Sequence, residues 1–270
     1  FKLTTAYEML RSLVGSEMCI RDSNADLGEY SSRDELNNEI SLIHHITSAS
    51  IACGGHAGDQ ESIGNMIEHC TRHNVLFGPH PSYPDKKGFG RKRLSISDET
   101  LIESIIDQVS LFFEIAKTHQ AEPTHVKFHG QLYNDCFSDE KISQLCLSAM
   151  QAVCPNTALM CQPYSVISDL AQRSGMKVIN EAFVDRRYQL NGALMERIIA
   201  DAVISSLDER TEQAALIACE EKVIAENAKE IEIKADTLCI HSDHSESIET
   251  AISIKEILEK HQCQIKSYDI

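Results

Sequence analysis

The chain has 270 residues, a length that commonly forms one α/β-barrel domain with a large core. Its 41 acidic and 25 basic residues give a formal net charge of −16, which disfavours binding to nucleic acid and to anionic membrane surfaces. No apolar stretch of the sequence approaches the roughly 18 to 20 residues that a membrane-spanning helix needs. We therefore expect a protein that acts on a small-molecule substrate and binds neither nucleic acid nor membranes.

Ten cysteines are present, and they fall mostly inside apolar or helical stretches without any CxxC pair. Disulfide-stapled secreted domains and zinc fingers space their cysteines differently. The pattern indicates free thiols in a reducing compartment, and we predict a cytoplasmic protein.

The first residues differ in character from the rest of the chain. We interpret residues 1–21 as a non-native or disordered N-terminal extension, and residues 22–270 as a single catalytic domain. The alternative is an amphipathic helix, because Tyr7, Leu10, Leu13 and Val14 have roughly helical spacing.

Seven short apolar runs recur along the chain, and each ends close to a polar or ionisable residue. The runs are residues 19–20, 49–53, 75–78, 125–128, 158–160, 177–179 and 238–240. Helix-like segments separate most of them, at residues 59–73, 97–119, 138–153, 166–174, 212–228 and 247–260. Strands that alternate with helices indicate βαβ units and a parallel sheet. We predict an α/β fold, a seven-stranded parallel β/α barrel of the TIM type, in which side chains at the carboxyl ends of the strands converge.

An open, doubly wound sheet is the alternative arrangement. Against a nucleotide-binding sheet of that kind, no GxGxxG follows a strand, and no GxxxxGK[ST] occurs in the sequence. The chain thus has no recognisable nucleotide-binding loop of its own.

Acidic residues follow the first run. Asn24, Asp26 and Glu29 lie around Gly28, and such a turn can direct Asp26 into the mouth of a barrel. Taken alone, an acidic turn is more often a solvated surface feature, so this segment gains meaning only beside the others.

Histidines follow several of the other runs. His56 stands among three glycines, which allow the backbone to approach a ligand closely. His80 lies between two prolines, which restrict its backbone and lower the entropy cost of holding the imidazole in place. Arg91 could bind a carboxylate or phosphate in bidentate geometry, or pair with a surface acid. After the last run, His241 and Asp243 repeat the arrangement of a histidine with a carboxylate.

Lys127 and His129 share one face of a predicted strand, because side chains two residues apart point the same way. A lysine buried in a strand needs an anionic partner, since an unpaired buried ammonium is costly. We expect Asp26, Glu181 or Asp185 to supply that partner.

Six segments, taken in order, resemble the successive signatures of the LamB/YcsF family, the A subunits of bacterial 5-oxoprolinase. They are residues 24–29, 51–59, 78–85 with 88–91, 125–133, 181–188 and 239–243. Together they span nearly all of residues 22–270.

The resemblance implies a barrel related to those of carbohydrate deacetylases, which opens 5-oxo-L-proline to L-glutamate with ATP as a co-substrate. It also implies B and C partner subunits, which fits the missing phosphate loop. On this basis we predict catalytic roles for Asp26, as general base, and for His56, His80, Lys127 and His129. The predicted substrate-binding residues are Asn24, Glu29, Arg91, Tyr133, Asp185, His241 and Asp243.

A divalent metal ion is a further cofactor that these residue types can bind, with Asp26, His56 and His80 as the candidate ligands. Two other functions stay open at this level. One is a metal-dependent carbohydrate deacetylase or hydrolase, and the other is a non-catalytic substrate-binding subunit.

Overall fold

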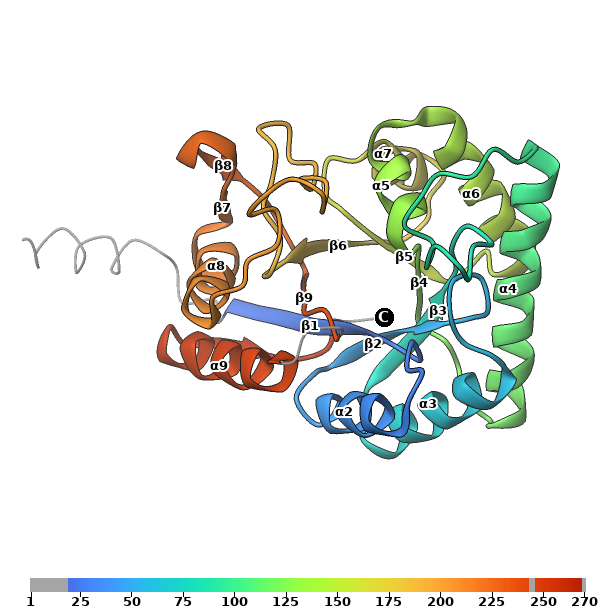
Figure 1. The fold of residues 1–270 in the computed structure, drawn as a ribbon, viewed down its shortest axis with the longest axis horizontal. Helices are drawn as coiled ribbons and strands as arrows, with labels where there is room; N and C mark the ends of the chain where they lie inside the picture. Colours follow the sequence, from blue (N-terminus) through green and yellow to red (C-terminus); the bar gives the residue numbers. More distant parts are fainter. Residues whose placement is uncertain (1–18, 243–245, 269–270) are drawn as a thin grey trace, which may run out of the picture.

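A computed structural model describes residues 19–242 and 246–268 of the chain. Seven parallel strands form a nearly closed barrel in the order β3-β2-β1-β9-β6-β5-β4 (Figure 1). The strands are β1 (Cys19–Leu27), β2 (Ser48–Ala52), β3 (Leu76–His80), β4 (His125–Lys127), β5 (Ala158–Cys161), β6 (Val178–Phe183) and β9 (Thr237–Cys239). Each of the seven apolar runs overlaps one of these strands, and the predicted seven-stranded parallel β/α barrel is confirmed. Most of the predicted N-terminal extension, residues 1–18, lies outside the described residues.

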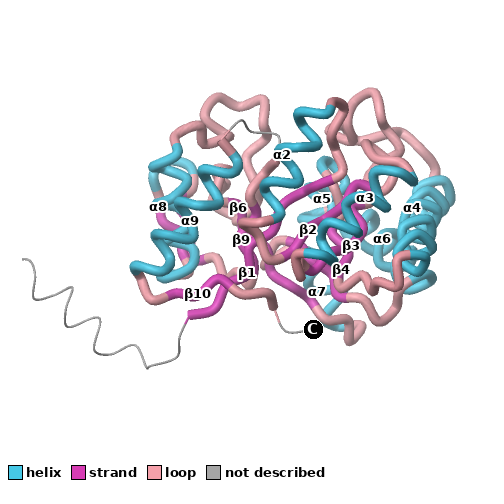
Figure 2. Tube along the Cα trace, turned by 90° about the horizontal axis from the view of Figure 1, so that it is seen from below, coloured by secondary structure: helices cyan, strands magenta, loops and turns pink. Residues whose placement is uncertain are grey.

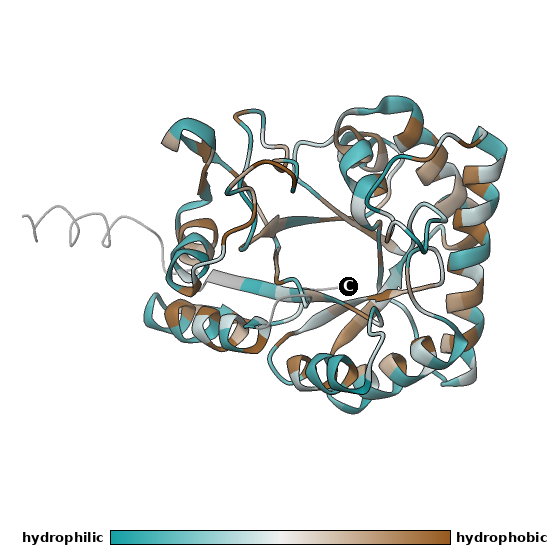
Figure 3. Ribbon diagram, in the orientation of Figure 1, coloured by the Kyte–Doolittle hydropathy of each residue, from teal (hydrophilic) through white to brown (hydrophobic). Residues whose placement is uncertain are grey.

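Helices surround the barrel on its outer side (Figure 1). They are α2 (Arg33–Ile43), α3 (Gln60–Arg72), α4 (Asp98–Thr118), α5 (Gly130–Ser138), α6 (Glu140–Val153), α7 (Val166–Arg173), α8 (Leu207–Glu220) and α9 (Ser247–Lys260). Figure 3 shows these helices with both hydrophilic and hydrophobic residues, and it shows a hydrophilic segment in β1, one of the strands of the barrel. Apolar side chains therefore fill the space between strands and helices, whereas part of the barrel interior is polar.

The longest helix, α4, shows how the sequence sets this packing. Its buried apolar residues Leu101, Ile105, Val109 and Phe112 recur every three or four positions, so they form one stripe on the helix surface. The Ser97 side chain accepts the N–H of the residue three positions later and caps the amino end. The stripe faces the barrel and contributes to one continuous core.

Within the described residues, ladder pairing is missing at one seam of the barrel, between β3 and β4. The Phe77 carbonyl faces β4 and accepts the N–H of Thr124 at 2.9 Å. Since alternate residues of a strand point their backbone groups to the same side, the nitrogen of Pro79 also faces β4, but it has no hydrogen to donate. Near the mouth, the His80 ring crosses the seam instead, with its Nδ1 2.7 Å from the carbonyl oxygen of Lys127.

Three short strands lie outside the seven. β10 (Cys263–Ile265) pairs with the first residues of β1, beside which it is seen in Figure 2. β7 (Lys222–Ile224) and β8 (Glu230–Glu232) form a separate antiparallel hairpin around the 3₁₀ turn Glu226–Ala228.

Two predicted helix boundaries are wrong. The helix expected to start at Ser138 starts later, because α5 ends at Ser138 and Asp139 caps α6 by accepting the N–H of Ile142. The helix expected to reach residue 228 ends at Glu220, since Glu221 turns into the left-handed region with φ 54° and the chain continues as β7. Both errors concern the outer layer and leave the barrel order unchanged.

The fold also bears on membrane-spanning helices and on the state of the cysteines. None of the helices in residues 19–242 and 246–268 combines the length and apolarity required to cross a bilayer. The nine cysteines whose side chains the structure describes are all free, as the sequence analysis predicted, and eight of them are buried.

Candidate active site

Asn24 and Asp26 lie inside β1, not in a turn that follows it. The strand continues to Leu27 and alternates buried polar residues with Ala25 and Leu27, which belong to the hydrophobic core. Neighbouring side chains of a strand point to opposite faces, so Asn24 and Asp26 face the barrel interior. The predicted turn position was wrong because polar residues in the middle of this strand are satisfied by other polar groups inside the barrel.

Lys127 is the centre of a buried ion-paired cluster. Its Nζ lies 2.8 Å from Asp26 Oδ1 and 2.7 Å from Glu181 Oε1, and it donates to Asn24 Oδ1 at 3.3 Å. Tyr133, from α5, donates its hydroxyl to the other oxygen of Glu181 at 2.7 Å. The expectation of an anionic partner for Lys127 is confirmed, with two carboxylates in place of one.

The charges in this cluster stabilise one another. Burial alone would raise the pKa of Asp26, but the positive charges of His80 and Lys127 hold that pKa well below its ordinary value. Burial alone would lower the pKa of Lys127, but Asp26, Cys239 and Glu181 raise it well above its usual range. Both groups are therefore ionised at neutral pH although water hardly reaches them.

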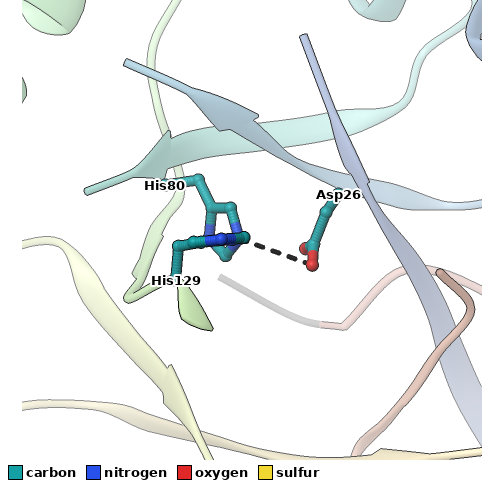
Figure 4. Close-up of side chains that lie close together, drawn as sticks. All are labelled: Asp26, His80 and His129. Carbon is teal, nitrogen blue, oxygen red and sulfur yellow. Dashed lines mark hydrogen bonds and ion pairs between the residues drawn. The ribbon is translucent and has the colours of Figure 1, made fainter. Parts of the chain in front are cut away.

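Two histidines adjoin Asp26 at the ends of β3 and β4 (Figure 4). His80 Nε2 lies 3.4 Å from Asp26 Oδ2 and 3.0 Å from His129 Nδ1. His129 precedes α5, and its Nε2 lies 3.0 Å from the carbonyl oxygen of Phe89. The loop after β3 thus covers the histidine that follows β4.

His56 lies one step further from Asp26. Its ring stacks on that of His129 at 3.5 Å with an interplanar angle of 3°, and its Nε2 contacts Glu29 Oε1 at 2.8 Å. Glu29 Oε1 also lies 3.4 Å from His129 Nδ1. Burial and the neighbouring His80 lower the pKa of His56 well below its ordinary value, and burial and His56 do the same to His129.

The structure therefore groups the candidate metal ligands differently from the prediction. Asp26, His80 and His129 place three donor atoms within 4.8 Å of one another, while His56 belongs to a second group with Glu29 and His129. The expected set of Asp26, His56 and His80 is not one of these groups among the described residues. His129 takes the place of His56 because the barrel brings β4 next to β3, which residue spacing could not show.

A second pair of ionisable groups lies beyond β6 and β9. His241 Nδ1 is 2.8 Å from both carboxylate oxygens of Asp185, and the ring stacks on Phe183. Burial would raise the pKa of Asp185, but His241 lowers it below its ordinary value. Asp185 is therefore the partner of His241 and not of Lys127. Asp243, predicted to bind substrate, lies outside the described residues.

Arg91 is the exposed member of the predicted set. Its guanidinium lies over the Phe89 ring at 4.9 Å, which is a cation–π contact at the edge of the histidine cluster. The remaining predicted substrate-binding residues are Asn24, Glu29 and Tyr133, and all three contact a catalytic candidate or its ion partner.

Two carboxylates of this region were missing from the predicted site. Glu181 was considered only as a partner of Lys127, although two-residue alternation along the sixth run would have placed it on the inner face. Glu39, from α2, accepts the N–H groups of Gly28 and Glu29 at 2.6 and 3.1 Å. Burial raises the pKa of Glu39 to about 8, and no local pattern marked it.

Fold and site together define a TIM-type β/α barrel with an ionisable cluster at the carboxyl ends of its strands, the usual position of active sites in such barrels. The model of the LamB/YcsF family matches residues 21–269, and the chain belongs to that family. The resemblance seen in the sequence is thereby confirmed.

Relatives and one solved structure support the assignment. The chain is 36% identical over 246 residues to proteins named as the A subunit of 5-oxoprolinase in two Staphylococcus aureus strains, bovine RF122 / ET3-1 and Newman, covering 91% of this chain and 98% of each relative. It is similar to the crystal structure of a lactam utilization protein from Thermus thermophilus, with a TM-score of 0.82 and 30% identity, over 92% of this chain and 99% of that one.

Proposed function

We propose that this chain opens the lactam ring of 5-oxo-L-proline to give L-glutamate in an ATP-dependent reaction in the cytoplasm. It would do so as the A subunit of a 5-oxoprolinase that also contains B and C subunits. The proposal is supported by the relatives named as the A subunit of this enzyme, which align with nearly the whole chain. It is also supported by the ionisable cluster at the mouth of the barrel.

The proposed chemistry follows from the stability of the lactam. An amide carbonyl is a poor electrophile, and transfer of the terminal phosphoryl group of ATP to its oxygen would release ADP and make the carbon reactive. Water then adds to that carbon, and the carbon–nitrogen bond breaks as the nitrogen takes up a proton, which leaves an acyl phosphate. A second water hydrolyses this acyl phosphate to the carboxylate and inorganic phosphate. The protein must hold the ring, direct the water and stabilise the charge that develops.

The position of Asp26 is the observation that carries the proposal. Asp26 lies near the carboxyl end of β1, and a different group holds each of its carboxylate oxygens. Lys127 contacts Oδ1, and His80 contacts Oδ2. The low pKa keeps the Asp26 carboxylate ionised, and a group that orients and deprotonates water must be ionised. The same low pKa makes Asp26 a weaker base. We assign Asp26 the task of acting on the attacking water.

The surrounding residues suggest roles in holding the substrate. Arg91 is the exposed cation at the edge of the site, so we propose that it binds the substrate carboxylate or a phosphate. Asp185 and His241 lie on the opposite wall and offer a hydrogen-bonding pair for the ring amide. Lys127 is already paired with two carboxylates, so we propose that it holds Asp26 in place instead of binding substrate directly.

ATP and the partner subunits enter together. The sequence contains no GxxxxGK[ST] motif, and we propose that B and C subunits complete the site at which ATP is used. A divalent metal ion is the other cofactor that the donor groups of this site suggest.

The donor group formed by Asp26, His80 and His129 also favours a second candidate, a metal-dependent hydrolase such as a carbohydrate deacetylase. That protein would be active as an isolated chain with its metal bound and would not need ATP. A non-catalytic binding subunit, the third function, would keep its affinity for 5-oxoproline when Asp26 or His80 is replaced.

The test is glutamate release from 5-oxoproline by the purified chain with ATP, in the presence and absence of matching B and C subunits. We expect turnover only with all three subunits and ATP, and a loss of at least about 100-fold in Asp26→Ala. Lys141→Ala, on the outer surface, is the matched control and should keep full activity. Full turnover by Asp26→Ala, or none by the wild-type complex with partners known to be active, would contradict the proposal.

A further inference from the structure

The loop between β6 and α8, residues 184–206, carries most of the exposed large apolar side chains that the structure describes. Of six such side chains in the described part of the chain, four lie in this loop. Scattered exposed apolar residues are ordinary, whereas several on one short segment mark a surface that binds another molecule. We call the four residues the apolar patch; they are Leu190, Ile198, Ile199 and Val203, with exposed fractions of 43%, 89%, 46% and 36%.

The backbone of this loop has a defined structure, although none of it belongs to the barrel strands. In Figure 1 it is the gold to light-orange chain between β6 and α8. Its first arm, residues 185–189, is hydrogen-bonded on both sides by the returning chain. The N–H of Met195 donates to the carbonyl of Arg187 at 2.9 Å, and the N–H of Arg187 donates to the carbonyl of Ala202 at 2.9 Å. The chain that carries the patch is therefore paired on both sides of this arm.

Buried polar side chains fix the loop to the barrel from below. The hydroxyl of Tyr188, which is fully buried, accepts the N–H of Phe183 at 2.7 Å. Gln213, from α8, donates its amide to the carbonyls of Phe183 and Arg186 at 2.8 and 2.9 Å. The guanidinium of Arg186 donates in turn to the carbonyl of Met195. A surface held in this way loses little conformational entropy when a partner binds to it.

The loop begins at the candidate active site. Asp185, its second residue, contacts His241 at the mouth of the barrel at 2.8 Å. Burial would raise the pKa of Asp185, but His241 and, with a smaller effect, the positive charge of Arg197 lower it. Arg197 directly precedes Ile198, the most exposed residue of the patch. A protein that covers the patch therefore lies beside the mouth.

The hairpin of β7 and β8 borders the patch. The N–H of Leu190 donates to the side chain of Glu226 at 3.2 Å, and the N–H of Glu226 donates to the carbonyl of Tyr188 at 2.9 Å. Residues 220–234, which contain the hairpin, have five acidic and three basic side chains, a net charge of −2. The patch thus has an acidic border on this side.

The charge of the loop indicates which kind of molecule fits the patch. Residues 185–204 contain three acidic and three basic residues and are neutral overall, in a chain with a net charge of −16. Two copies of so acidic a chain repel each other, which disfavours self-association through the patch. A partner with an apolar face and basic residues around it complements both the patch and its acidic border.

We propose that the apolar patch is the docking surface for the partner subunit that uses ATP. This inference rests on the function proposed above and deepens it, because it names the surface through which the subunits meet. Activation of the lactam requires the phosphoryl group of ATP to reach the substrate at the mouth. A subunit docked on the loop that begins at Asp185 is next to that position.

The experiment is a binding titration of the purified, full-length chain with matching B and C subunits, followed by biolayer interferometry. Ile198→Asp and Ile199→Asp should each weaken the affinity for the partners by about tenfold or more, because a charge then replaces an apolar contact. Ile252→Asp, on α9, is the matched control; this isoleucine is 38% exposed but lies outside the patch, and the variant should bind with wild-type affinity. Since these side chains are exposed, circular dichroism spectra and thermal midpoints should stay those of wild type.

Turnover separates this inference from the proposed function. With saturating partner subunits, the Ile198→Asp complex should regain wild-type glutamate release, because the substitution affects assembly and not the active site. Wild-type affinity in both Ile198→Asp and Ile199→Asp would overturn the inference, while turnover by the wild-type complex would still support the proposed function. A wild-type homodimer that Ile198→Asp dissociates would assign the patch to a second copy and also overturn the inference. Absence of any complex between the wild-type chain and active partners would overturn both.

Discussion

The pKa values of buried ionisable groups shift towards the neutral forms at one end of the barrel interior and towards the charged forms at the other. At the floor, near the amino ends of the strands, Asp22 contacts hydroxyl groups and His125 contacts Ser50 and Tyr268. Burial raises the pKa of Asp22 to about 6 and lowers that of His125 to about 3. At the mouth, Asp26 and Lys127 are equally buried, yet their pKa values move in the directions that favour the charged forms.

The difference lies in what each group contacts. Neutral hydroxyl donors only partly replace water around Asp22, so burial dominates there. At the mouth each charge has an opposite charge within 3 Å, and the mutual attraction outweighs the loss of hydration. The floor therefore holds buried polar groups among neutral partners, while the mouth holds buried charges that are paired with one another.

Removing the cation at the mouth should have the largest effect. Lys127→Met leaves Asp26 and Glu181 buried without their counter-charge, and we expect a loss of about 3–5 kcal/mol in the free energy of unfolding. Urea denaturation followed by circular dichroism measures it. Lys141→Met, whose ammonium contacts Asp98 at 2.8 Å on the surface, should change stability by less than about 1 kcal/mol. Equal losses in the two variants would show that the mouth is no different from the surface.

At the floor, Asp22 should make stability fall as the pH rises. Because its folded-state pKa is about 6 against an ordinary 3.8, its favourable contribution is complete below pH 3.8 and is lost as the pH rises through 6, at a cost of about 3 kcal/mol. Asp22→Asn should remove this slope in urea titrations between pH 4 and 6. Ser48→Ala, which deletes a hydroxyl donor to Asp22, should extend the decline to higher pH. Parallel profiles for wild type and Asp22→Asn would refute the interpretation.

The histidine of the floor should act with the opposite sign. The folded-state pKa of His125 is about 3 against an ordinary 6.5, so its contribution is present above pH 6.5 and is lost as the pH falls towards 3. At pH 5 the loss should be about 2 kcal/mol. His125→Gln should therefore be less sensitive to acid than wild type, which equilibrium unfolding at pH 7 and pH 5 would show. If acid destabilises both proteins equally, the floor does not hold this ring neutral.

Sequence patterns predicted the barrel better than they predicted the site. The seven apolar runs gave the strands, and alternation placed Lys127 and His129 on one face, because both features depend on neighbouring residues. The predictions about the site were incomplete where they depended on contacts between residues of different strands. His129, and not His56, joins Asp26 and His80 in one donor group. Of the three acids expected near Lys127, Asp26 and Glu181 pair with it, while Asp185 pairs with His241.

The sequence by itself determined the strand and helix order, the family and the residue types that gather at the mouth, since short-range pattern and composition carry that information. Only the tertiary structure decided the partners. Lys127 and Asp26 are 101 positions apart, and their contact exists because barrel closure brings β1 and β4 to a common interior. The same closure sets the carbonyls of Lys127 and Phe89 against the rings of His80 and His129.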